Sequence, residues 1–181
     1  RQLRWGSNLF HVGILFLFAG HFVGLLTPHW IYEHFISASS KQMLAVVSGG
    51  LAGTACFIGL TMLLHRRLTD PRIRITSSTM DIAILVVLWS QPILGLLTLP
   101  FSLQHADGSV MLVLSEWAQR ILTLRSGAAD LVRDVALAYK LHLVLGLTTF
   151  LLFPFSRLVH IWSAPVGYLF RSYQVVRRRG A

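Results

Sequence analysis

Four long hydrophobic windows limit what this chain can fold into. They run from about Leu9 to Leu26, Met43 to Leu64, Ile82 to Leu103 and Leu141 to Phe155, and none contains Asp, Glu, Lys or Arg. A helix of around 20 apolar residues crosses a bilayer, and the last window continues helically on both sides. Of the 181 residues 54% are hydrophobic and 13% charged, which is atypical of a soluble domain. The sequence therefore predicts an all-α integral membrane helical bundle with four transmembrane helices.

The spans are expected at about residues 8–27, 43–64, 80–102 and 135–162, in a single domain with a basic tail at 165–181. The helical pattern of the last span extends from about Leu131 to Trp162. At 1.5 Å per residue that is about 48 Å, longer than the hydrocarbon core, so the helix must project, tilt or bend. Pro154 is the predicted bend. Between the third and fourth spans, Val110 to Arg125 has the pattern of an amphipathic helix, expected on the outer membrane surface.

The formal net charge of +9 indicates topology rather than nucleic-acid binding. Basic residues cluster before the first span, after the second and after the fourth. They are Arg1 and Arg4; Arg66, Arg67, Arg72 and Arg74; and Arg171, Arg177, Arg178 and Arg179. By the positive-inside rule these three segments are cytoplasmic, so both ends of the chain are expected there. The first residue is Arg and no signal peptide is visible, so the chain is expected to be a fragment.

The cysteine content restricts the cofactor chemistry. Cys56 is the single cysteine, which excludes an intrachain disulfide, a four-cysteine iron-sulfur site and covalent haem attachment. Any haem is therefore held non-covalently, and Cys56 is expected to serve helix packing. In the same window Gly49 and Gly53 form a small-xxx-small pair, which indicates close helix packing or room for a flat macrocycle.

Histidines within the first and fourth spans are the candidate ligands. An ionisable side chain at membrane depth is a functional candidate by default. If the two spans are antiparallel, His11 and His160 lie toward the cytoplasmic side, and His21 and His142 lie toward the outer side. Porphyrin iron has two axial positions, and one imidazole from each helix fills both. The sequence therefore predicts two bis-histidine haems, which carry electrons because no coordination position remains open.

The spacing of these histidines leaves a second interpretation open. His142 and His160 are separated by about 27 Å along a straight helix, whereas His11 and His21 are separated by about 15 Å. Tilt or a bend must absorb the difference. In the alternative, each imidazole makes an interhelical hydrogen bond in a bundle without haem. Zinc is disfavoured because the pairs lie too far apart to form one tetrahedron.

Six segments of the chain resemble a known family. They are SNLFH at Ser7–His11, GHF at Gly20–Phe22, LTPHW at Leu26–Trp30, GLLTLPFS at Gly95–Ser102, LHLVLG at Leu141–Gly146 and LFPFSRLVHIWS at Leu152–Ser163. They resemble the gamma subunit of respiratory nitrate reductase, a membrane cytochrome b. The resemblance implies two b haems with the histidine pairs given above. That family usually has a further transmembrane helix, N-terminal to the part that this chain resembles.

The resemblance also implies a function. The chain is expected to be a multi-pass subunit of a quinol-nitrate oxidoreductase in a bacterial or archaeal inner membrane, with a cytoplasmic C-terminus, serving anaerobic respiration. It is expected to oxidise menaquinol or ubiquinol near the outer face. Electrons pass through both haems to an iron-sulfur beta subunit, then to a molybdenum-containing alpha subunit that reduces nitrate. Membrane lipid is a further expected partner, and nucleic acid is not.

Three residues are candidates for binding the quinol or a haem propionate. Lys41, at the start of the second span, is expected to hydrogen-bond a quinone oxygen near the outer haem; a snorkelling lysine is the competing interpretation. Gly20, beside His21, permits close approach of the quinone ring. Arg157, one helical turn before His160, is expected to pair with a haem propionate, or to serve only the positive-inside pattern.

Two alternative functions remain open at this point. The first is a dihaem cytochrome b of another quinone-linked oxidoreductase. The second is a haem-free transporter or membrane anchor in which the histidines bond between helices or relay protons. The transporter is disfavoured because nothing in the sequence resembles paired repeats of broken helices.

Overall fold

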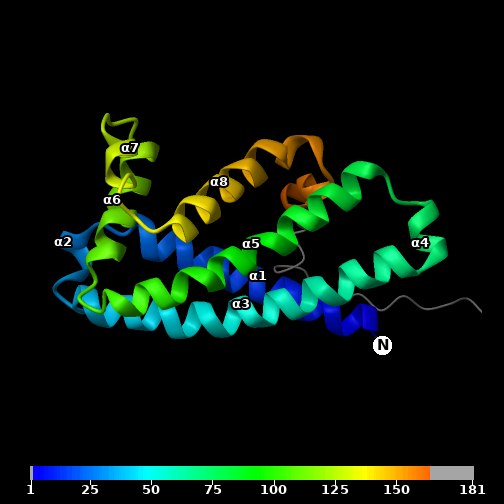
Figure 1. The fold of residues 1–181 in the computed structure, drawn as a ribbon, viewed down its shortest axis with the longest axis horizontal. Coiled ribbons are helices and arrows are strands. Elements are labelled where there is room, and N and C mark those ends of the chain that lie inside the picture. Colours follow the sequence, from blue (N-terminus) through cyan, green and yellow to red (C-terminus); the bar gives the residue numbers. More distant parts are fainter. Residues whose placement is uncertain (1, 164–181) are drawn as a thin grey trace, which may run out of the picture.

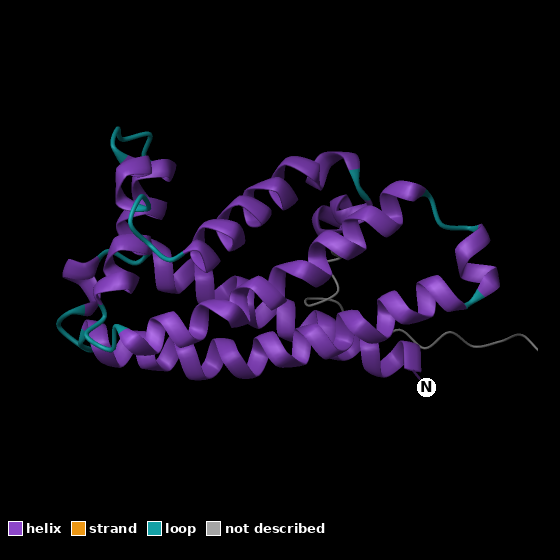
Figure 2. Cartoon of the chain, viewed as in Figure 1, coloured by secondary structure: helices purple, strands orange, loops and turns teal. Residues whose placement is uncertain are grey.

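Four long helices form the body of the molecule (Figure 1). The computed structural model describes residues 2–163, and the regular structure in that range is entirely helical (Figure 2). The long helices are α1 (Gln2–Leu26), α3 (Ala38–Thr69), α5 (Thr79–Gln104) and α8 (Leu137–Leu152). Each includes a stretch long and apolar enough to cross a bilayer, α8 together with the turn that follows it. The predicted all-α membrane bundle is therefore confirmed. The predicted tail at 165–181 lies outside the described residues.

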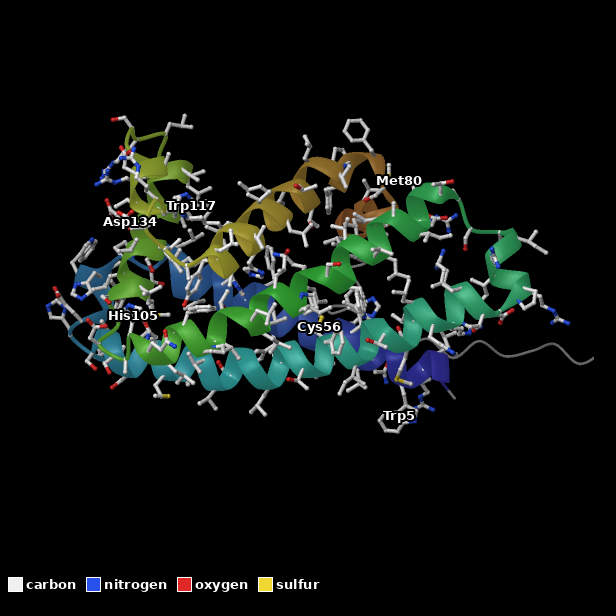
Figure 3. The ribbon with its side chains drawn as sticks, viewed as in Figure 1. Trp5, Cys56, Met80, His105, Trp117 and Asp134 are labelled. Atoms are coloured by element: carbon white, nitrogen blue, oxygen red, sulfur yellow. The ribbon has the colours of Figure 1, made fainter. Side chains whose placement is uncertain are left out.

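Short elements close the two ends of the bundle. They are α2 (His29–Tyr32), α4 (Pro71–Ile75), α6 (Ser109–Leu122), α7 (Ala128–Leu131), and the 3-10 segments η1 (Phe153–Phe155) and η2 (Arg157–Ser163). The helices α2, α6 and α7 lie at one end and α4 lies at the other (Figure 1). Figure 3 places Trp117 and His105 toward the first end and Trp5 toward the second. Following the predicted topology, we call the first end the outer end and the second the inner end. The helices α1 and α8 run between them in opposite directions.

Glycine and cysteine bring α1 and α3 into close contact. A Cβ atom on Gly59 of α3 would lie 2.5 Å from the backbone nitrogen of Phe10, and one on Gly13 of α1 would lie 2.9 Å from the Cβ of Cys56. Cys56 is fully buried near the middle of the bundle (Figure 3). Its predicted packing role is therefore supported. Contacts then continue from α3 to α5 and from α5 to α8.

The predicted small-residue pair in α3 divides into a packed and an open position. Gly53 is buried, and a Cβ atom there would lie 3.2 Å from the side chain of Leu96 on α5. Gly49, one turn earlier, has no neighbouring heavy atom within 4 Å of its Cβ position. Helix packing therefore explains Gly53 and does not explain Gly49.

The helix α6 corresponds to the predicted amphipathic helix, but it packs through its polar side. Ser115 and Ala118 are its buried residues. The hydroxyl of Ser115 donates to the carbonyl of Gly24 at 3.3 Å, and the amide of Gln119 donates to the carbonyl of Leu25 at 3.0 Å. The last carbonyls of a helix lack intrahelical donors. The polar side of α6 supplies donors to the end of α1, while the predicted apolar stripe lies on the opposite side of α6.

The fourth span differs from the prediction in its second half. The α-helix ends at Leu152 instead of continuing toward Trp162, and a 3-10 turn containing Pro154 follows. Proline has no N–H for a helical bond, which is the physical reason for the change. The backbone is extended at Ser156, with φ −123° and ψ 171°, and then enters η2. The chain turns back beside α5 here (Figure 1). The predicted bend at Pro154 is confirmed, and the straight 27 Å separation of His142 from His160 does not apply.

Candidate functional site

The two outer histidines face each other across the bundle. The ring centroids of His21 on α1 and His142 on α8 are 6.1 Å apart, and the ring planes are inclined by 41°. Two imidazoles that bind one metal from opposite sides, at about 2.0 Å per bond, have centroids about 6 Å apart. A linear hydrogen bond between two imidazoles of about 2.9 Å requires a centroid separation of only about 5 Å. The observed separation is therefore longer than a direct linear hydrogen bond requires, and it leaves room for one metal ion between the two rings.

Three of the four candidate imidazoles share one arrangement. Their Nδ1 atoms lie within hydrogen-bond distance of a carbonyl in the preceding turn. The bonds join His11 to Ser7 at 2.7 Å, His21 to Leu17 at 2.8 Å and His160 to Arg157 at 2.5 Å. A carbonyl can only accept, so Nδ1 carries the proton and Nε2 keeps its lone pair. This is the tautomer in which histidine binds a metal through Nε2.

The helix α5 fixes the position of His142. A Cβ atom on Gly95 would lie 3.1 Å from Cε1 of the His142 ring, so a side chain at this position would press against the ring. The amide of Gln91, one turn earlier on α5, donates to the backbone carbonyl of His142 at 3.1 Å. Within the described residues, Nδ1 of His142 and Oε1 of Gln91 are buried without a hydrogen-bond partner. The outer site therefore includes polar atoms whose hydrogen-bonding capacity the protein itself leaves unused.

A second contact holds α8 one turn before His142. Tyr139 is buried, and its hydroxyl lies 2.6 Å from the Ser102 hydroxyl and 3.3 Å from the carbonyl of Thr98. Residue patterns alone did not single out Gly95, Gln91 or Tyr139. A usable signal existed for two of them, because Gln91 and Gly95 are four residues apart and so share a face of the third span.

The inner pair is not in ring contact. His11 lies on α1 and His160 on η2, both with exposed side chains, and their rings do not stack on each other in the described structure. Within residues 2–163 no three His, Cys, Asp or Glu side chains form a metal cluster. The structure thus brings together the outer pair, and gives the inner pair only the shared Nδ1 arrangement.

An iron porphyrin fits the outer site by spacing and by donor chemistry. The extensive contacts of α1 are with α3 and α6, and those of α8 are with α5, within the described part of the chain. The side of α1 that carries His21 is exposed, and Gly20 beside it has no heavy atom within 4 Å of its Cβ position. Imidazole nitrogens with free lone pairs are the usual axial ligands of b-type haem iron. The residues present therefore fit the predicted group.

Lys41 has a distinctive position at the outer end. Its Nζ atom is buried, makes no hydrogen bond within the described residues, and lies 3.5 Å from the ring centroid of Tyr32 on α2. The Tyr32 hydroxyl is also buried without a partner, and burial, with a smaller contribution from the negative charge of Glu33, raises the pKa of Tyr32. A cation over an aromatic face is held without spending its hydrogen-bond donors. The ammonium group of Lys41 therefore has hydrogen-bond donors that the described residues leave unused.

Arg157 makes an ion pair that the sequence pattern did not indicate. Its Nε atom lies 2.8 Å from Oδ1 of Asp81, the third residue of α5. The Arg157 side chain remains 72% exposed, and this contact uses one of the five N–H donors of the guanidinium. The predicted contact with a haem propionate is thus compatible with the ion pair, because four donors remain.

Comparison with known proteins places the whole chain in one group. The family model described as nitrate reductase gamma subunit matches residues 1–179. The chain is 56% identical over 179 residues to the respiratory nitrate reductase 1 gamma chain of Escherichia coli (strain K12), covering 99% of this chain and 80% of that protein. It is 38% identical over 180 residues to the nitrate reductase gamma chain of Bacillus subtilis (strain 168), covering 99% of this chain and 80% of that protein. It is 35% identical over 182 residues to the nitrate reductase-like protein NarX of Mycobacterium tuberculosis (strain CDC 1551 / Oshkosh), of which it spans 28%.

Proposed function

Because the chain belongs to the nitrate reductase gamma subunit family, we propose that it is the dihaem cytochrome b that passes electrons from quinol to the rest of the complex. The family makes it a subunit of nitrate reductase, and its four apolar helices make it a multi-pass membrane protein. The observation that carries the proposal is the 6.1 Å separation of the facing His21 and His142 rings. This spacing suits one iron atom between them.

The four histidines have the same role at two depths. His21 and His142 hold the outer haem, and His11 and His160 hold the inner one. Each haem, when bound, supplies an iron that accepts and releases one electron. The backbone carbonyls on Nδ1 of His11, His21 and His160 orient the rings and increase the basicity of Nε2.

Lys41 and Gly20 belong to the quinol site in this proposal. The ammonium group of Lys41, held over Tyr32, donates a hydrogen bond to a quinol oxygen. Gly20 leaves space beside His21 for the quinol ring. Menaquinol and ubiquinol both present such an oxygen. Protons leave on the outer side, and the electrons move toward the inner haem.

The partners follow from the direction of electron flow. An iron-sulfur beta subunit receives electrons at the inner end, and a molybdenum-containing alpha subunit reduces nitrate in the cytoplasm. The C-terminus of this chain is cytoplasmic in this arrangement. Moving an electron inward against the membrane potential costs about 2.3 kcal/mol per 100 mV. Nitrate must therefore be oxidising enough to cover that work.

A two-step optical experiment tests the proposal. Anaerobic membranes containing the chain and the other subunits are mixed with quinol, and the b-haem absorbance is followed before and after nitrate is added. We expect quinol to reduce the haems and nitrate to reoxidise them. Haems that dithionite reduces but quinol does not would contradict quinol oxidation. Reduction by quinol without reoxidation by nitrate would indicate another oxidoreductase.

A further inference from the structure

A buried carboxylate joins three elements at the inner end. The side chain of Asp81 is 5% exposed, and Asp81, the third residue of α5, forms a capping box with Ser78. The Ser78 hydroxyl accepts from the Asp81 backbone N–H at 3.2 Å, and Oδ2 of Asp81 accepts from the Ser78 N–H at 3.0 Å. Capping alone requires one carboxylate oxygen and no burial of charge.

The other oxygen of this carboxylate connects to the segment carrying His160. Oδ1 of Asp81 lies 2.8 Å from Nε of Arg157, while Nη1 of Arg67 on α3 lies 4.0 Å from Oδ2. Removing a charge partner from a buried ion leaves an uncompensated charge, so such contacts hold their elements together. Asp81 thus fixes the first residue of η2 to the start of α5.

Arg157 in turn holds the imidazole of His160. The Arg157 carbonyl accepts from Nδ1 of His160 at 2.5 Å. Residues three apart in a 3-10 helix lie above one another, so the two side chains share one side of η2. The chain of contacts runs from the Asp81 carboxylate through the Arg157 side chain to the Arg157 carbonyl and the His160 ring.

We propose that Asp81 is a positioning residue for His160, acting through Arg157, and that it sets the orientation of the inner axial imidazole. This inference rests on the proposed function, since it assumes that His160 is a haem ligand. The ion pair joins η2 to a distant part of the chain. The α-helix ends at Leu152, so helical hydrogen bonds do not carry the geometry of α8 as far as His160.

Substitutions in the full chain, expressed with the other subunits in membranes, test this inference. The inner and outer haem signals are first assigned from His160→Leu and His21→Leu. Asp81→Asn, which keeps an oxygen for the cap, is expected to shift the midpoint potential and the low-spin EPR signal of the inner haem alone. It is also expected to weaken retention of the inner haem by about tenfold.

A double-mutant comparison separates positioning from stability. Arg157→Gln is expected to change the inner haem as Asp81→Asn does, and the double variant is expected to be no worse than Arg157→Gln alone. Ser78→Ala is the matched control: it removes the cap hydroxyl without contacting Arg157, so it is expected to lower the melting temperature and leave the inner haem signal unchanged.

The outcomes distinguish this inference from the proposed function. Wild-type protein with two haems, together with Asp81→Asn that behaves like Ser78→Ala, would contradict the positioning role and leave the proposed function intact. Wild-type protein without haem would contradict the proposed function itself. If Asp81→Asn does not accumulate, Arg157→Gln decides, because an unchanged inner haem in that exposed-site variant also overturns the inference.

Discussion

The outer and inner ends of the molecule position their histidines in different ways. At the outer end, His142 lies on the regular helix α8, and its ring packs against Gly95 of the neighbouring helix α5. At the inner end, His160 lies on the 3-10 segment η2, which follows the end of the α-helix. The ion pair of Arg157 with Asp81 anchors this segment.

The two sites should therefore respond differently to substitution. A site formed by packed helices tolerates the loss of one polar contact, because many packing contacts together fix its geometry. It does not tolerate added volume. A site on a short anchored segment has the opposite sensitivity, because one charged contact fixes it.

Added volume at Gly95 should remove the outer haem. Gly95→Leu would place its side chain where the His142 ring lies, since a Cβ atom alone is 3.1 Å from Cε1. We expect a pyridine haemochrome count of one haem per chain instead of two, with the inner haem signal retained. Two haems in the Gly95 variant would contradict the contrast.

Removal of the Lys41 charge should affect quinol oxidation without affecting haem content. A hydrogen bond to a charged donor contributes about 1.5–3 kcal/mol, so Lys41→Met should lower quinol-dependent haem reduction by at least about tenfold. Anaerobic stopped-flow reduction by quinol measures this rate. Arg133→Met, which removes an exposed outer-end cation, serves as the control. Equal rates in both variants would contradict the role of Lys41 in the quinol site.

Added volume between α1 and α3 should destabilise the bundle as a whole. Gly59→Ala places a Cβ atom 2.5 Å from the Phe10 nitrogen, so α1 must move away from α3. Overpacking of this kind costs about 1–3 kcal/mol. Thermal unfolding followed by the haem absorbance should therefore occur at a lower temperature than in Gly49→Ala. Unfolding at the same temperature would show that the two helices do not need this close approach.

Loss of one polar contact at the outer end should have the smallest effect. Tyr139→Phe removes the hydroxyl contacts with Ser102 and Thr98, worth about 1 kcal/mol of stability. We expect two haems and an unchanged outer haem potential. Thr148→Val, which removes a hydroxyl bonded within its own helix, is the control. A large shift in the outer haem potential would show that the outer site also depends on one contact.

Periodicity and charge predict the four spans and the bundle class because membrane helices satisfy their own backbone hydrogen bonds. The depth order of four histidines likewise predicts the pairing of His21 with His142, whose ring centroids lie 6.1 Å apart in the structure. Contacts between segments that are distant in the sequence could not be predicted from it. The fit of His142 against Gly95 depends on how α5 and α8 are rotated, and the ion pair of Arg157 with Asp81 depends on the chain turning back after Pro154.

Two histidine pairs should hold two b haems. A dithionite-reduced minus oxidised spectrum with a pyridine haemochrome count, on the wild type and on His21→Leu, His160→Leu and His105→Leu, measures this. His105 also bonds a carbonyl one turn earlier through Nδ1 but lies at the end of α5. We predict two haems in the wild type and in His105→Leu, and one in each of the other two, with different spectra. A colourless wild-type protein from haem-replete cells would contradict the account.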